Sequence, residues 1–148
     1  MIIDTRDFGR VEVDAGSVFA FPEGLYGFEK DRTMALFVRT YDDIPFLYLQ
    51  SVTNTVPCFL VFEPVDLFPG FAPEVDADDL KALEATTSSE LMFLLIANVP
   101  DSVEGLSLNV KSPIAINPKT KIGRQIILQN DDYSLRYQPF SAEEGRDA

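Results

Sequence analysis

The sequence predicts an all-β fold, mainly antiparallel, in which the strands form a small closed β-barrel-like domain with one short helix. Three observations support this prediction. Short apolar or alternating runs recur along the chain and turn residues separate them, as is typical of sandwiches and barrels. These runs are rich in Phe, Leu, Val and Tyr, most of which pack well on a pleated surface. Only one segment places apolar residues at helical spacing.

Each expected strand is an apolar or alternating run that ends at a turn signal. The first two runs flank residues 6–9, which predicts an N-terminal hairpin, and the third stops at Pro22. The run 91–98 is apolar at nearly every position, which indicates a strand buried on both faces. In chain order, the expected strands are 3–5, 10–13, 18–21, 34–39, 46–52, 59–62, 91–98, 106–110, 114–117 and 125–128.

The one expected helix covers residues 77–84. Asp76 is a good N-cap residue, and Asp79 stands three residues later near the positive end of the helix. Leu80 and Leu83 then share one helix face. Because the helix is short, packing against the sheet must hold it in place. The preceding segment 65–73 contains Pro and Gly and is expected to be a loop.

A chain of 148 residues corresponds to one domain by the usual length relation. We expect residues 1–140 to form that single domain and the polar tail 141–148 to be disordered. A domain near this size buries about 68–70% of the surface of its unfolded chain, so it is stable without disulfides or metals. The hydrophobic content of 46% agrees with a globular protein.

The chain carries none of the usual signs of a membrane or secreted protein. No apolar stretch approaches the ~20 residues that span a bilayer, and the N-terminus lacks the basic and apolar regions of a secretion signal. The only cysteine, Cys58, rules out an internal disulfide and fits a reducing compartment. We therefore expect a cytoplasmic protein that is monomeric when free.

The charge of the chain argues against binding to nucleic acids. It has 24 acidic and 12 basic residues, for a net charge of −12, whereas RNA and DNA binding depends on cations that replace phosphate counterions. Anionic membrane surfaces are disfavoured for the same reason. Between Glu63 and Glu104 there are ten acidic residues and one base, Lys81. This region suits a basic protein partner.

The familiar catalytic and metal-binding residue sets are missing. The chain has no histidine, which removes Ser–His and Cys–His pairs and imidazole ligands, and one cysteine does not make a zinc site. We therefore expect no enzymatic activity, no cofactor and no metal. The alternative is a small-barrel hydrolase that uses two carboxylates. The acidic pairs 42–43, 78–79 and 131–132 are poor candidates, because adjacent side chains point in different directions.

A series of motifs resembles the family of the flagellar assembly factor FliW. The match runs from the first hairpin to about Tyr137, so it covers all but the tail. In family order it comprises FPEGLYGFE at 21–29, PFLYLQS at 45–51, Pro64, FPGF at 68–71, NVP at 98–100, LNVKSPIAIN at 108–117, GRQIIL at 123–128, Tyr133 and Arg136. The chain departs from the family pattern at Leu25–Tyr26 and at Gly70–Phe71, and the second departure lies in the acidic region.

The resemblance implies a protein that exchanges partners. FliW-like proteins are similar in binding the RNA-binding regulator CsrA and, alternatively, flagellin. Binding of CsrA, outside its RNA site, relieves the repression of flagellin mRNA, and unsecreted flagellin reverses this by occupying the factor. A dedicated flagellin chaperone without a translational role is the alternative within the same family.

The residues expected to contact a partner lie between the sixth strand and the end of the helix. Phe68 and Phe71 flank loop-breaking residues, so they are hard to bury completely, although they would also serve to cover the small helix. The nearby carboxylates are the electrostatic candidates. The set comprises Phe68, Phe71, Glu74, Asp76, Asp78, Asp79 and Glu84.

Overall fold

The structure is a computed structural model that describes residues 1–140, so the expected tail 141–148 lies outside the described residues. The strands are β1 (Ile2–Thr5), β2 (Gly9–Glu12), β3 (Val18–Ala20), β4 (Thr33–Tyr41), β5 (Ile44–Ser51), β6 (Cys58–Phe62), β7 (Met92–Asn98), β8 (Ser107–Leu108), β9 (Ile114–Asn117) and β10 (Ile122–Gln125). The α-helices are α1 (Pro64–Leu67) and α2 (Ala77–Ala82), and the 3-10 helices are η1 (Ala15–Ser17), η2 (Ser88–Glu90) and η3 (Val103–Gly105).

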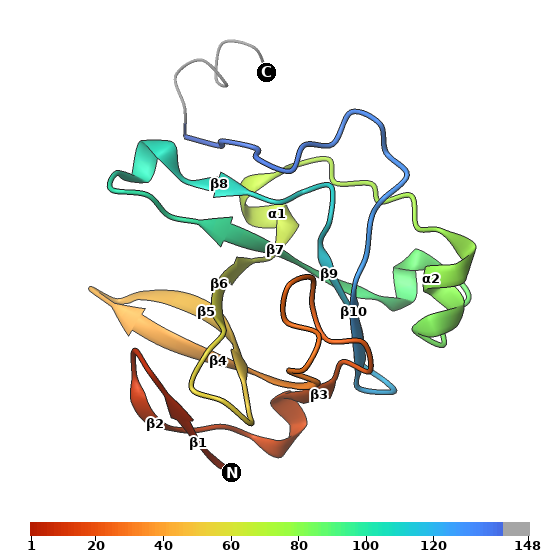
Figure 1. Ribbon diagram of the computed structural model, residues 1–148. Helices are drawn as coiled ribbons and strands as arrows, with labels where there is room; N and C mark the ends of the chain where they lie inside the picture. Colours follow the sequence, from red (N-terminus) through yellow and green to blue (C-terminus); the bar gives the residue numbers. More distant parts are fainter. Residues whose placement is uncertain (141–148) are drawn as a thin grey trace.

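The main sheet curls until its two sides meet (Figure 1). Its strand order is β6-β5-β4-β3-β10-β9-β7-β8, and an additional pairing of β6 with β7 closes it into a barrel, from which β8 extends as a branch. The β3–β10 pair is parallel, and the other pairs among the described strands are antiparallel. The predicted all-β, mainly antiparallel, barrel-like fold is confirmed.

The barrel interior is filled by large apolar side chains. Inward-pointing residues of β3, β4, β5, β6, β7 and β9 meet in one cluster, at the alternate positions that the two-residue period of a strand requires. Its buried members are Phe19, Phe21, Leu25, Met34, Leu49, Val61, Leu94, Ile114 and Ile116. Phe21 and Leu25 come from the segment 21–32, which crosses in front of the curled sheet in Figure 1.

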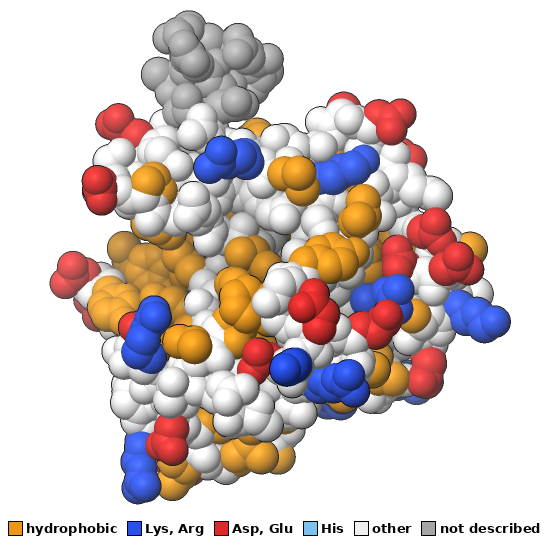
Figure 2. Space-filling model, in the orientation of Figure 1, with side chains coloured by type: hydrophobic (Ala, Val, Ile, Leu, Met, Phe, Trp, Pro, Cys, Tyr) orange, Lys and Arg blue, Asp and Glu red, His pale blue; other side chains and the backbone are white. Residues whose placement is uncertain are grey.

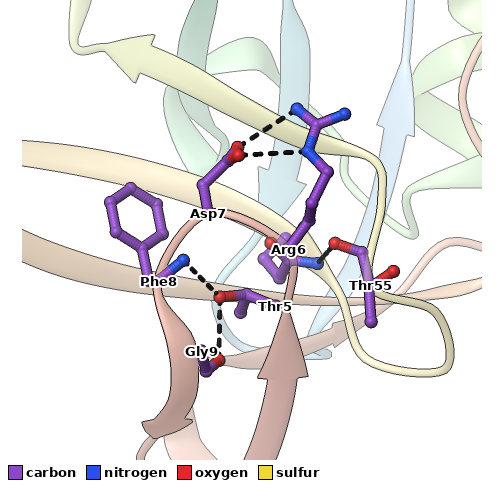
Figure 3. A network of polar contacts seen from close by, with 7 residues as sticks. Thr5, Arg6, Asp7, Phe8, Gly9 and Thr55 are labelled. Carbon is purple, nitrogen blue, oxygen red and sulfur yellow. Dashed lines mark hydrogen bonds and ion pairs between the residues drawn. The ribbon is translucent and has the colours of Figure 1, made fainter.

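The hairpin of β1 and β2 packs on the outer face of β4 and β5. Its turn is held by Thr5, whose hydroxyl donates to the Gly9 carbonyl at 2.8 Å and accepts from the Phe8 amide at 2.9 Å (Figure 3). The Arg6 amide donates to the Thr55 carbonyl at 3.1 Å, which ties the turn to the β5–β6 loop. Phe8 then contacts the rings of Phe37 and Tyr48. The predicted N-terminal hairpin therefore covers this side of the barrel.

The face of β7 that points away from the barrel interior is also covered by other side chains. Leu94 faces the interior, whereas its neighbour Leu95 lies in an outer cluster with Leu106, Leu108 and Val110. Both leucines are fully buried, so the prediction of a strand buried on both faces is confirmed. Within residues 1–140 no helix is long and apolar enough to cross a membrane.

The predicted helix is α2, and Asp76 is its N-cap, since its side chain accepts a hydrogen bond from the Asp78 amide at 2.6 Å. Leu80 and Leu83 share one apolar cluster, as their spacing predicts. The helix ends earlier than expected because Glu84 adopts a left-handed backbone conformation with φ of 55°.

A second short helix was not expected from the sequence. The segment predicted as the loop 65–73 begins with α1, in which Pro64 occupies the first turn. Proline suits this position, because its fixed φ is helical and its missing N–H would have no partner there.

Two strands are shorter or shifted. The strand expected at 125–128 is observed at Ile122–Gln125, directly after the turn that ends with Lys121 at φ of 64°. Ile126 and Leu128 are still buried, and their amides donate to Pro113 and Lys111. The strand expected at 106–110 is reduced to Ser107–Leu108, because the Asn109 side chain turns the chain by accepting from the Ser112 amide at 2.8 Å.

Gly123 allows β10 to lie against the core. A Cβ atom added there would come within 2.4–2.8 Å of the Phe21 ring, which is fully buried. Gly123→Ala should therefore lower the free energy of unfolding by about 1–3 kcal/mol, the usual cost of overpacking. Urea denaturation would measure it. Gly16→Ala is the matched control, because nothing lies within 4 Å of its added Cβ. Equal midpoints for the two variants would contradict this packing.

Candidate functional site

The predicted acidic residues gather around α2 and the segment before it. In Figure 2 acidic side chains lie over and beside α2, on the right, whereas hydrophobic side chains gather in the hollow between the β4–β5 hairpin and β7. The structure thus separates an acidic flank from apolar surface. We use the name acidic flank for the residues Glu74, Asp76, Asp78, Asp79 and Glu84.

Two members of the acidic flank have structural partners. Asp76 caps α2, as described above. Asp79 forms an ion pair with Arg124 of β10 at 3.0 Å, and its side chain is only 15% exposed. Burial raises the pKa of Asp79 above its ordinary value, while the Arg124 guanidinium acts in the opposite direction. Arg124 also contacts Glu23, so it connects α2 with the segment before Leu25.

The remaining acids are exposed. Glu74, Asp78 and Glu84 are all solvent-accessible. Glu74 is anchored through its backbone, and its carboxylate also accepts a hydrogen bond from the Asn130 side-chain amide at 3.4 Å. Its amide donates to the Asn130 side chain at 2.8 Å, and its carbonyl accepts from Gln129 at 2.9 Å. Asp78, Glu84 and Glu74 are therefore the charges of this flank that an approaching molecule would meet.

Phe68 and Phe71 are half-buried in an aromatic cluster. The Phe68 ring lies 5.1 Å from Tyr133 and 4.8 Å from Tyr137, edge to face. Phe71 stacks on Tyr133 at 5.8 Å and meets the edge of Phe93 at 5.5 Å. Phe71 also shares an apolar cluster with α2, whereas Phe68 packs on the C-terminal segment. Much of their surface is thus used internally.

The remaining surface of both phenylalanines lines a groove of about 490 Å³. Pro64 and Val65 of α1 and Met92 and Phe93 of β7 also line it. Val65 is 75% exposed. Among residues 1–140, the only charged residue that lines the groove is Glu63, directly after β6. The groove therefore offers an apolar surface with one carboxylate at its edge.

A second cavity, of about 700 Å³, lies at the barrel end next to this groove, and both share Glu63 and Met92. Leu36, Val38 and Leu47 of β4 and β5 contribute apolar surface, and Glu12 and Asp14 contribute carboxylates. Sequence reasoning missed all of these residues. Each belongs to an ordinary strand or turn, and only barrel closure brings them together.

The described residues offer little for covalent or metal chemistry. Among residues 1–140, no group of three or more His, Cys, Asp or Glu side chains is placed to hold a metal ion. Burial raises the pKa of the Cys58 thiol to about 11, so the thiol stays protonated near neutral pH and is a poor nucleophile.

The class defined by this fold and surface is a small β-barrel protein with an acidic flank and an apolar groove, both suited to contact with other proteins. The family model described as FliW protein matches residues 2–139. This chain belongs to the FliW family, as its motifs indicated.

Relatives of this family match along nearly the whole chain. The flagellar assembly factor FliW of Thermoanaerobacter pseudethanolicus is 34% identical over 137 residues, which span 93% of this chain and 91% of the relative. That of Geotalea uraniireducens is 31% identical over 144 residues, or 97% and 87% of the two chains. A crystal structure of the flagellar assembly factor FliW superposes with a TM-score of 0.83 at 27% identity, covering 97% of this chain and 99% of that one.

The capping role of Asp76 separates it from its exposed neighbour. Asp76→Ala removes the acceptor for the Asp78 amide and should lower the free energy of unfolding by about 1 kcal/mol. Asp78→Ala removes an exposed carboxylate at the same end of α2 and should cost clearly less. Chemical denaturation of both variants would compare them. An equal loss would mean that charge near the helix end, and not the cap, is what matters.

The raised pKa of Cys58 predicts slow alkylation. With a pKa of about 11, the thiolate fraction at pH 7.5 falls about a hundredfold below that of an unperturbed thiol. Iodoacetamide should therefore modify the native protein about a hundred times more slowly than the same protein unfolded in urea, and the native rate should still increase above pH 9. A native rate that levels off near pH 9 would contradict the burial of this thiol.

Proposed function

We propose that this protein is a flagellar assembly factor that binds CsrA, antagonises its repression of flagellin mRNA and releases it when flagellin binds instead. It acts in the cytoplasm by binding and carries out no catalysis. The observation that carries the proposal is membership of the FliW family along almost the entire chain, with relatives named flagellar assembly factors. The CsrA and flagellin partners follow from the resemblance described for the sequence.

The charge distribution supports this proposal physically. CsrA binds RNA and must therefore present cations to phosphate, so an acidic partner is attracted to it over several ångströms. The exposed carboxylates of Asp78 and Glu84, placed beside bound CsrA, would also repel incoming phosphates without touching the RNA-binding residues. Antagonism of this kind requires contact outside the RNA site only.

Calorimetric titration with CsrA, before and after saturation with flagellin, would test the partner exchange. We expect CsrA to bind the free protein and flagellin to abolish or strongly weaken that binding. Retained flagellin binding without any CsrA binding would replace the proposal by a dedicated flagellin chaperone. Binding of neither protein would remove it altogether.

The role of the acidic flank is tested by neutralising its exposed charges. Asp78→Asn with Glu84→Gln should weaken CsrA binding roughly tenfold in low salt, because each exposed charge pair contributes about 0.2–1 kcal/mol. The difference should shrink as salt screens the interaction. Asp4→Asn with Asp101→Asn removes the same charge from exposed sites outside α2 and is the matched control. An equal effect of both pairs would indicate net charge alone.

A further inference from the structure

Among the described residues, the seam that closes the barrel leaves one edge of part of β7 without a strand partner. β6 pairs with β7 only through Val61 with Ile96 and Phe62 with Leu95. If the β6–β7 pairing continued at the same register, Pro64 would lie opposite Phe93. The chain instead turns into α1 at Pro64. The edge of β7 at residues 92–94 that faces away from β9 is therefore open, and the groove described above lies along it.

The backbone of Phe93 points toward this opening. The carbonyl of Ile96 accepts from the Asn109 amide on the β8 side, and the direction alternates along a strand, so the groups of residue 93 face the β6 side. Among residues 1–140, no hydrogen bond to the Phe93 amide or carbonyl is found on that side. An open donor and acceptor on a strand edge form a template for an added strand.

The opposite wall of the opening does not offer the same template. β5 also extends beyond its pairing with β6, which starts at Leu47. The Ser51 amide donates to the Pro57 carbonyl, so odd-numbered residues of β5 face the β6 side. Beyond Leu47, the next residue whose backbone groups face that free edge is therefore Pro45. Proline has no N–H to donate to an added strand. The template is the edge of β7 alone.

The two cavities meet at this edge, and the strand presents one face outward and one face to the barrel interior. Phe93 packs outward with Phe71 and lines the groove only, whereas Met92 packs against the interior cluster and lines both cavities. Successive side chains of a strand added beside residues 92–94 would point alternately to these faces. Apolar side chains would therefore enter both the groove and the barrel end.

The charges around the opening determine which charged residues are favoured at the ends of such a segment. Glu63 lines both cavities, and Glu12 and Asp14 line the larger one. Within the described part of the chain, no Lys or Arg lines either cavity. A second copy of this chain, with a net charge of −12 and the same acidic rim, would be repelled. A segment with Lys or Arg next to its apolar residues would be attracted.

We propose that the open edge of β7 at residues 92–94 binds an extended, apolar segment of a partner protein that carries Lys or Arg at its ends, by addition of a strand. This inference rests on the proposed function, in that it assumes a protein partner, and it specifies the chemistry of the segment. The added strand forms backbone hydrogen bonds with Phe93, and its alternate side chains bind in the two cavities.

The test uses a short synthetic peptide of Val and Leu flanked by lysines, titrated into the full chain and followed by amide NMR and hydrogen exchange. We expect shifts around residues 92–94 and slowed exchange of the Phe93 amide. A peptide with glutamate in place of lysine should bind at least tenfold more weakly. No binding of the lysine peptide, equal binding of both, or shifts located elsewhere would overturn the proposal. Protection of Phe93 that grows with protein concentration alone would overturn it in favour of a second copy.

Two variants with matched exposed apolar residues complete the test. Val65→Lys places a cation on the groove wall and should weaken lysine-peptide binding roughly tenfold. Ile127→Lys, at a site 55% exposed and outside both cavities, should leave it unchanged. Equal binding by both variants would contradict the site. Titrations of the wild-type protein with CsrA and flagellin separate this inference from the proposed function. If the protein binds the peptide but neither CsrA nor flagellin, only the proposed function is contradicted. If it binds these partners but the peptide leaves Phe93 unaffected, only this site is contradicted.

Discussion

Closure of the sheet between β6 and β7 is the constraint on which the rest of the structure depends. Only two residue pairs form this seam, yet it turns an open curled sheet into a barrel whose interior is filled by buried apolar side chains. β6 is short, and Pro64 directs the chain into α1 immediately after it. The same proline that ends the seam therefore leaves the next part of β7 open. Barrel closure and the exposed strand edge have one common cause.

In the acidic flank, the composition does not show which carboxylates stabilise the fold and which stay exposed at the surface. Asp76 and Asp79 belong to the same acidic run as Asp78, yet one caps α2 and the other pairs with Arg124. Because Arg124 also reaches Glu23, this pair helps to fix α2 against the barrel. Folding thus uses part of the charge and leaves the rest at the surface, so a partner would meet fewer carboxylates than the sequence suggests.

The sequence predicted most strands because their signals are local. β4, β5 and β7 are long apolar or alternating runs, and α2 has both a cap and an apolar face, so each could be recognised without knowledge of its neighbours. The shift of β10 has a different cause: Ile126 and Leu128 are buried as a strand would be, but Pro113 and the Asn109 turn shape the chain beside them. No local pattern contains that information.

The groove could not be predicted for a related reason. Phe68 and Phe71 were recognised from the loop residues between them, and both do line it. Their partners Met92, Val65 and Glu63 come from a buried strand, a helix that the sequence did not reveal and a strand end. A site assembled from several elements becomes visible only when the topology is known, whereas a motif that binds through one loop would be visible in the sequence.

The arrangement of these surfaces bears on how the proposed partners would displace one another. Phe71 and Phe93, which line the groove, share an apolar cluster with Leu80 and Leu83 of the acidic flank's helix. A ligand that shifts Phe93 would therefore act on the packing of α2. If CsrA contacts the acidic flank and flagellin the open edge, exchange does not require overlapping sites. It requires coupling through this cluster, and such coupling must be reciprocal: each partner weakens the other by the same factor. An overlap of the two sites would instead make the partners mutually exclusive at any concentration, with no ternary complex.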